Sequence, residues 1–220
     1  MVLEQKYTRA APALANYSYT DLDEGTGFVL YYAMEGTDEN LLRKTATYSN
    51  SVVQFYSEGT YDGTFKKRID IDYDVEFNTS KTMEGRAIIT VTGGCYTKVA
   101  ETNSLYVIAK LRKWDGATET EIATNTSDTY TTGSTINTTY SKTFCVEIDT
   151  PQTVFKSGES LRLTIELWVR LGSGAGNADF GYGNDPIGRS DVVDFPNPTQ
   201  VIRDADTTKL EAHIPFRLNL

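Results

Sequence analysis

The chain of 220 residues has one histidine and two cysteines. Zinc sites and related metal centres need several imidazole or thiolate ligands, so this shortage excludes multi-histidine sites. A serine or cysteine triad would depend on His213 alone, which lies in a C-terminal segment with strand alternation. Cys95 and Cys145 lack CxxC spacing, and we expect both to be buried free thiols.

An excess of basic residues is also missing. The chain has 21 Lys and Arg against 30 Asp and Glu, which gives a formal net charge of −9. Nucleic-acid affinity comes mainly from Lys and Arg that displace counterions from phosphates, so DNA and RNA are not expected as direct ligands. The short basic clusters at 66–68 and 110–113 are flanked by acidic residues and are typical of a solvated strand face.

No segment has the long apolar run of a membrane span, and residues 1–16 lack the apolar core of a signal peptide. We therefore expect a protein that folds in the cytoplasm and does not contact a membrane. Residues 1–16 mix polar residues, alanines and a proline without a period, which predicts an extended N-terminal arm. Residues 17–220 are expected to form a single domain.

A helical period is equally scarce, and 38–46 is the best short candidate for a helix. Strand alternation is abundant instead. The strongest example runs from Leu161 to Leu171, with aliphatic residues on one face and Arg162, Thr164, Glu166, Trp168 and Arg170 on the other. A second example sets Ile69, Ile71, Tyr73, Val75 and Phe77 against the acidic residues Asp70, Asp72, Asp74 and Glu76.

Further strands are predicted at 28–33, 87–92, 105–111, 144–148 and 214–220. The Gly93-Gly94 and Thr150-Pro151 pairs are expected to end two of them, and Asp115-Gly116 predicts a hairpin. Eight or more strands without a βαβ rhythm favour an all-β fold, an antiparallel β-sandwich of jelly-roll type.

The glycine-rich stretch 172–191 is expected to be a long loop. Its hard oxygen donors Asp179, Asn184 and Asp185 are candidate calcium ligands, although the order matches no EF-hand; an ordinary loop with Asx turns is the alternative. No other cofactor is expected. The acidic row 70–76 offers the paired carboxylates that a glycosidase needs, but a solvated outer face is the commoner explanation of such a row.

Trp168 lies opposite the core row of its own strand, so its face is expected to be covered by a second layer or by a partner. We take Arg162, Trp168 and Arg170 as candidate partner contacts, together with Tyr7, Arg9 and Leu14 of the arm.

Two stretches, 17–35 (YSYTDLDEGTGFVLYYAME) and 154–189 (VFKSGESLRLTIELWVRLGSGAGNADFGYGNDPIGR), resemble structural proteins of tailed bacterial viruses, particularly capsid decoration proteins with a jelly-roll fold. The likeness is one of general character over roughly a quarter of the chain, and no site residue carries over from it.

The resemblance implies a non-enzymatic virion protein, assembled in the host cytoplasm, that forms a homo-oligomer and clamps major capsid subunits. A trimer is the favoured oligomer. The alternative is a carbohydrate- or receptor-binding β-sandwich of a tail fibre, which predicts exposed aromatic side chains near the glycine-rich loop.

Overall fold

The structure, a computed structural model, describes residues 15–16, 26–35, 40–45, 53–59, 63–172, 177–183 and 210–217. Every regular element in these ranges is a β-strand, and no helix in them is long and apolar enough to cross a membrane. The strands are β1 (Ala15–Asn16), β2 (Thr26–Glu35), β3 (Asn40–Arg43), β4 (Val53–Glu58), β5 (Lys66–Glu76), β6 (Lys81–Thr97), β7 (Ser104–Trp114), β8 (Glu119–Thr126), β9 (Tyr130–Thr131), β10 (Thr138–Phe155), β11 (Ser160–Arg170), β12 (Ala178–Gly183) and β13 (Leu210–Arg217).

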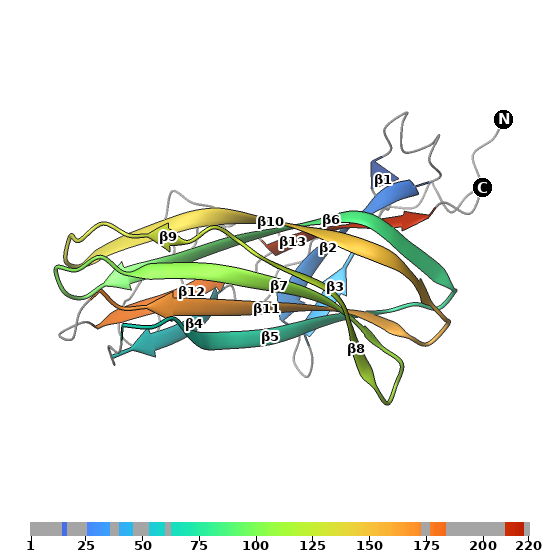
Figure 1. The fold of residues 1–220 in the computed structure, drawn as a ribbon, viewed down its shortest axis with the longest axis horizontal. Helices are drawn as coiled ribbons and strands as arrows, with labels where there is room; N and C mark the ends of the chain where they lie inside the picture. The colour runs from blue at the N-terminus through green and yellow to red at the C-terminus, as the bar shows by residue number, and fades with distance from the viewer. Residues whose placement is uncertain are drawn as a thin grey trace.

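The strands form one path in the order β4-β12-β6-β13-β2-β3-β5-β11-β7-β8, with β10 also paired to β6. All pairings are antiparallel except β3 with β5, which meet in parallel at the single pair Leu41 and Asp74. This narrow link is where the path passes from one layer to the other. The predicted all-β antiparallel sandwich is confirmed (Figure 1).

The two layers share one apolar core. The inward row of β11, residues Leu161, Leu163, Ile165, Leu167 and Val169, is at most 1% exposed, as the alternation predicts. Tyr73 of β5 and Tyr182 of β12 lie in the same core, and their hydroxyls meet at 3.1 Å. The core therefore satisfies at least one pair of buried polar groups internally.

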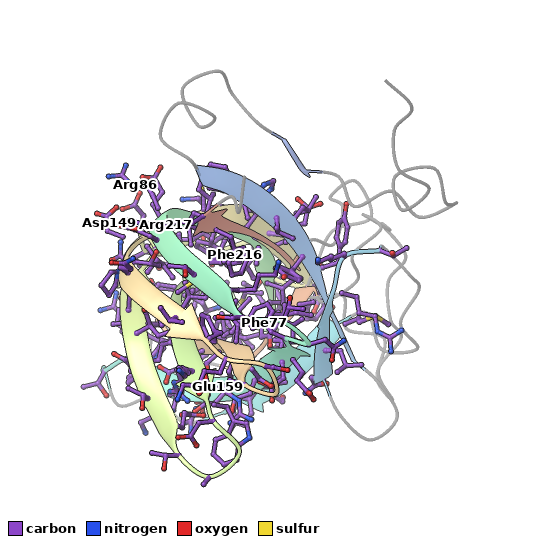
Figure 2. All side chains as sticks on the ribbon, turned by 90° about the vertical axis from the view of Figure 1, so that its right-hand side faces the viewer. Phe77, Arg86, Asp149, Glu159, Phe216 and Arg217 are labelled. Atoms are coloured by element: carbon purple, nitrogen blue, oxygen red, sulfur yellow. The ribbon has the colours of Figure 1, made fainter. Side chains whose placement is uncertain are left out.

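One end of the sandwich is closed by three aromatic rings: Phe77, which directly follows β5, Phe155 of β10 and Phe216 of β13. The Phe77 ring lies 5.0 Å from the Phe155 ring and 5.7 Å from the Phe216 ring, both edge-on. Figure 2 shows Phe77 and Phe216 between the layers, while Arg86, Asp149 and Arg217 lie at the rim. The aromatic cluster excludes water from this end because its rings fill the space between the layers.

The structure confirms most predicted strands and the hairpin at Asp115-Gly116, which joins β7 to β8. Asp115 Oδ1 accepts the backbone N–H groups of Ala117 and Thr118, at 2.9 and 2.7 Å. His213 lies in β13 as expected, directly between Leu30 of β2 and Ile88 of β6.

Two predicted strand ends are wrong. β6 continues through Gly93-Gly94, because these residues pair with β10 on one side and β12 on the other. A Cβ at Gly93 would come within 3.1 Å of the Phe144 ring, so glycine here permits close packing. β10 continues past Pro151, since the proline falls in a register irregularity between Thr150 and Thr153 where no regular ladder bond is needed.

The best short candidate for a helix, 38–46, contains the strand β3 instead, which pairs with β2. Two further expectations fail. The stretch 172–191 is not wholly a loop, because β12 lies within it, paired with both β4 and β6. Cys95 is a buried free thiol, but Cys145 points outward and is exposed. Of the predicted arm, Ala15 and Asn16 pair with β2, and residues 1–14 lie outside the described residues.

The close packing at Gly93 gives a stability prediction. Gly93→Ala should lower the free energy of unfolding by about 1–3 kcal/mol, because the added methyl group overpacks the Phe144 contact. Gly59→Ala is the matched control, since a Cβ there meets nothing within 4 Å, and its stability should be unchanged or slightly raised. Urea unfolding followed by circular dichroism measures both. Equal stability of the two variants would contradict the close packing.

Candidate functional site

Strands β5, β11, β7 and β8 lie side by side in that order and form one layer, which we call the second layer. The outward side of this layer carries a dense group of charged and aromatic side chains, which we call the polar face. Because these strands pair in register, acidic residues of β5 lie beside basic residues of β11 and β7. The polar face consists of Phe65, Lys67, Asp70, Asp72, Asp74, Tyr106, Lys110, Arg112, Trp114, Glu119, Arg162, Thr164, Glu166, Trp168 and Arg170.

Arg162 ties three of these strands together. Its Nε and Nη2 donate to the two carboxylate oxygens of Asp74 at 2.8 and 2.7 Å, and its Nη1 donates to Glu119 at 2.7 Å. The guanidinium also lies over the Trp114 ring, 5.4 Å from its centre. The hydrogen bonds to Asp74 are the main reason why the pKa of Arg162 is raised above its usual value. Arg162, which the sequence predicts to contact a partner protein, therefore already forms its ion pairs within the chain.

Glu166 is the most buried charge of the polar face, with its side chain 3% exposed. Its carboxylate oxygens accept hydrogen bonds from the Lys110 ammonium at 2.7 Å, the Lys67 ammonium at 3.3 Å and the Trp168 indole N–H at 2.8 Å. Burial alone would raise the pKa of Glu166, but these donors outweigh it, and the pKa lies below its usual value. Glu166 is thus held as a carboxylate.

Trp168 belongs to a run of aromatic contacts along the polar face. Its ring stacks on Tyr106 at 5.9 Å with an interplanar angle of 9°, and Tyr106 contacts Phe65 at 4.8 Å. Arg170 follows, with its guanidinium 4.7 Å from the centre of the Phe65 ring. Trp168 is half-buried by these neighbours, which does not fit the exposed sugar platform that a carbohydrate-binding module would present.

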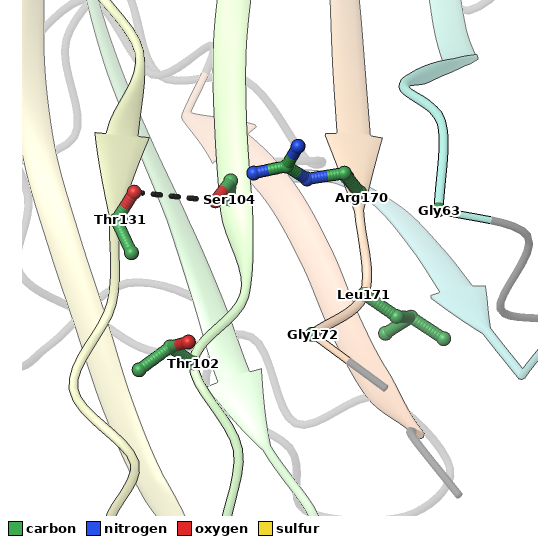
Figure 3. Close-up of a pocket in the computed structure, with 7 residues that line it drawn as sticks. All are labelled: Gly63, Thr102, Ser104, Thr131, Arg170, Leu171 and Gly172. Atoms are coloured by element: carbon green, nitrogen blue, oxygen red, sulfur yellow. Dashed lines mark hydrogen bonds between the residues drawn. The ribbon is translucent and has the colours of Figure 1, made fainter. Parts of the chain in front are cut away.

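A pocket of about 180 Å³ opens where β11 ends. Gly63, Leu171 and Gly172 line it together with the polar side chains of Thr102, Ser104, Thr131 and Arg170. The Ser104 and Thr131 hydroxyls lie 3.2 Å apart, and Figure 3 shows the Arg170 guanidinium extending towards Ser104. Nothing in the sequence pattern marks this pocket, because it combines four separate chain segments.

The predicted calcium ligands are not brought together among the described residues. Asp179 lies in β12 with its side chain 1% exposed, and its Oδ1 accepts Lys98 Nζ at 2.7 Å and Ser57 Oγ at 2.6 Å. Lys98 already neutralises this carboxylate, and no group of three or more His, Cys, Asp or Glu in the described ranges could hold a metal ion. Asn184 and Asp185 lie outside the described residues, as do Tyr7, Arg9 and Leu14.

The acidic row of β5 is not a bare acidic surface. Asp70 pairs with Lys67, and Asp72 accepts the Thr164 hydroxyl while lying 3.6 Å from Arg162. Asp70 is therefore paired within its own strand, and Asp72 with a basic side chain of the neighbouring strand β11. The sequence pattern missed these pairs because it shows which face a side chain occupies but not which strand lies beside it.

No protein family matches the sequence, and no curated protein is similar to it. Its fold does match solved structures. An aminopeptidase from a marine sediment archaeon, Thaumarchaeota archaeon, superposes with a TM-score of 0.52 over 88% of this chain, at 7% identity. A CocE/NonD family hydrolase from Staphylococcus aureus matches 87% of the chain with a TM-score of 0.48 and 12% identity. The fold of this chain is therefore shared with part of the aminopeptidase. The chain spans only 37% of the length of either protein.

The match to the aminopeptidase corrects the expectation of a non-enzymatic capsid decoration protein and its tail-fibre alternative. Infectious bursal disease virus also matches, over 84% of the chain at 12% identity, but its TM-score of 0.27 carries no argument. The resemblance to virion β proteins is supported only to that extent. The sequence resemblance misled because it rested on composition and alternation, which unrelated β-sandwiches share.

The pairing of Glu166 gives a stability prediction. Glu166→Gln should lower the free energy of unfolding by about 1–3 kcal/mol, since Lys67 and Lys110 lose their buried counter-charge. Glu147→Gln is the control, because Glu147 forms an exposed pair with Arg86, and its cost should stay below about 0.5 kcal/mol. Chemical denaturation at pH 7 compares the two. If both variants lost a similar free energy of unfolding, burial would not be what makes the ion pairs of Glu166 important for stability.

The lowered pKa of Glu166 predicts how its stabilisation depends on pH. A group whose pKa is lowered on folding stabilises the fold above its unfolded pKa, here about 4.5, and this contribution disappears as the pH falls through the folded pKa. The stability difference between the wild type and Glu166→Gln should therefore be largest at neutral pH and shrink below pH 4.5. Urea titrations between pH 7 and pH 3 measure it. A stability difference that grows as the pH falls would contradict the lowered pKa of Glu166 in the folded protein.

Proposed function

We propose that this chain is the β-sandwich unit of a hydrolase that cleaves acyl bonds, and that it acts beside a catalytic unit. The observation that carries the proposal is the match to the archaeal aminopeptidase, which covers 88% of this chain but 37% of that one. More than half of the aminopeptidase therefore has no counterpart here, and a catalytic unit corresponds to that remainder.

The chemistry of the described residues supports a division of labour. Acyl transfer by a nucleophilic enzyme needs a nucleophile, a base and an orienting group within hydrogen-bond reach of one another. His213 has Leu30 and Ile88 directly opposite it on the neighbouring strands, and neither can act as nucleophile or orient an imidazole. The nucleophile and its base are therefore assigned to the catalytic unit, and the sandwich is assigned to shaping or supporting that unit.

Co-expression tests the proposal. The chain would be produced together with each acyl hydrolase encoded beside it in its genome, and also alone. One of these hydrolases should copurify with it at a fixed stoichiometry, as measured by light scattering after size exclusion. Its kcat/KM on 4-nitrophenyl acetate or alanine 4-nitroanilide should rise at least about tenfold in the complex, equivalent to about 1.4 kcal/mol of transition-state stabilisation.

The interpretation depends on both readouts. A stable complex with raised kcat/KM supports the proposal. Unchanged kinetics in every combination, or the absence of any complex, would contradict it. A variant with both Arg162→Gln and Glu166→Gln reports whether the polar face contributes, provided that its circular dichroism spectrum is that of the wild type.

A further inference from the structure

The pocket at the end of β11 is lined by several hydrogen-bond donors, and none of the described residues that line it is a carboxylate. Arg170 brings a guanidinium with five N–H donors, and Thr102, Ser104 and Thr131 bring hydroxyls. Within the described ranges, Arg170 forms no ion pair, unlike Arg162 and Arg112 of the same polar face. The pocket therefore contains a cation whose charge no described carboxylate balances.

The donors are held in place by their neighbours. Arg170 stacks on Phe65, and Ser104 lies directly opposite Arg170 in the ladder between β7 and β11. The Ser104 and Thr131 hydroxyls share one hydrogen bond, so one of the two protons stays free to point at a ligand. A guanidinium fork beside a free hydroxyl is well suited to an anion with two or more oxygens.

The size of the pocket restricts the ligand. Its volume of about 180 Å³ holds several water molecules, since each occupies about 30 Å³ in the liquid. A carboxylate or a phosphate group fits this space. Leu171 and Gly63 leave one side of the lining without charge, so the anion is expected to enter with its oxygens towards Arg170.

The geometry points to an oxyanion-binding site in this pocket, in which the Arg170 guanidinium and the Ser104–Thr131 hydroxyl pair bind a carboxylate or phosphate group. The site is independent of the proposed hydrolase role, because it uses none of the residues of a catalytic unit. It is a binding site of the sandwich itself.

Nuclear magnetic resonance titration of the whole chain tests the site, with sodium acetate as the carboxylate, inorganic phosphate as the phosphate, and sodium chloride at matched ionic strength. The amide signals of Ser104, Thr131, Arg170 and Gly172 should shift saturably with acetate, phosphate or both, and not with chloride. The tighter of the two anions identifies the ligand class.

Arg170→Gln should weaken binding at least about tenfold, because it removes the charge-assisted hydrogen bonds. Thr131→Val should weaken it severalfold and provides an independent test, since Thr131 is exposed and its replacement is close in shape. Arg86→Gln is the matched control, an exposed arginine in the other layer, and should bind as the wild type does.

Three outcomes would overturn the proposal. Linear shifts that chloride reproduces would show ionic-strength effects only. Unchanged affinity in both Arg170→Gln and Thr131→Val would place any binding elsewhere. An equal loss in Arg86→Gln would show that net charge, and not this pocket, attracts the anion.

Discussion

The organisation of the second layer depends on the position of β11 between β5 and β7. One face of this strand is fully buried in the core by its aliphatic row, and the other is covered by long side chains from both neighbours. Thr164 and Glu166 are consequently buried on the outward side as well, at 0% and 2% exposure. A buried carboxylate is tolerated only with partners, and this requirement explains the lysines and the indole N–H that surround Glu166.

The same constraint explains why the polar face is ordered. Asp72 and Asp74 of β5 lie beside Arg162 of β11, whereas Asp70 pairs with Lys67 of its own strand. Arg162 also connects β5 to β8 across β11 and β7. Arg170, at the end of β11, lies beyond the last of these pairs. Strand geometry thus divides one face into a part where ion pairs link neighbouring strands and an end where, among the described residues, the Arg170 guanidinium lies over the Phe65 ring and beside hydroxyl side chains.

The sequence predicted the elements whose side chains alternate, because a period of two is a direct result of strand geometry. It located β5, β7, β11 and β13, and it placed Arg162, Trp168 and Arg170 together on one face. It did not locate β12, since Gly181 and Gly183 break the apolar pattern and the strand is defined by its pairing with β4 and β6.

The ion pairs and the pocket could not be predicted for a related reason. Many of their partners are far apart in the chain, as are Arg162 and Asp74 at 88 positions, and only the strand order brings these together. The function inferred from the sequence failed for a different reason. Acidic, Thr-rich β-sandwiches occur in many kinds of protein, so composition and alternation define a fold class without selecting a function.

The position of β12 has a consequence for the synthesis of the protein. β4 and β6 are made early, yet the strand that pairs with both lies near the end of the described chain, and Ser57 is 122 positions away from its partner Asp179. A ribosome adds about 5–20 residues per second, so these two strand edges stay unpaired for about 5–25 seconds. During that interval the nascent chain exposes templates for pairing with other chains, and we expect its yield in a cell to depend on chaperones that cover those edges.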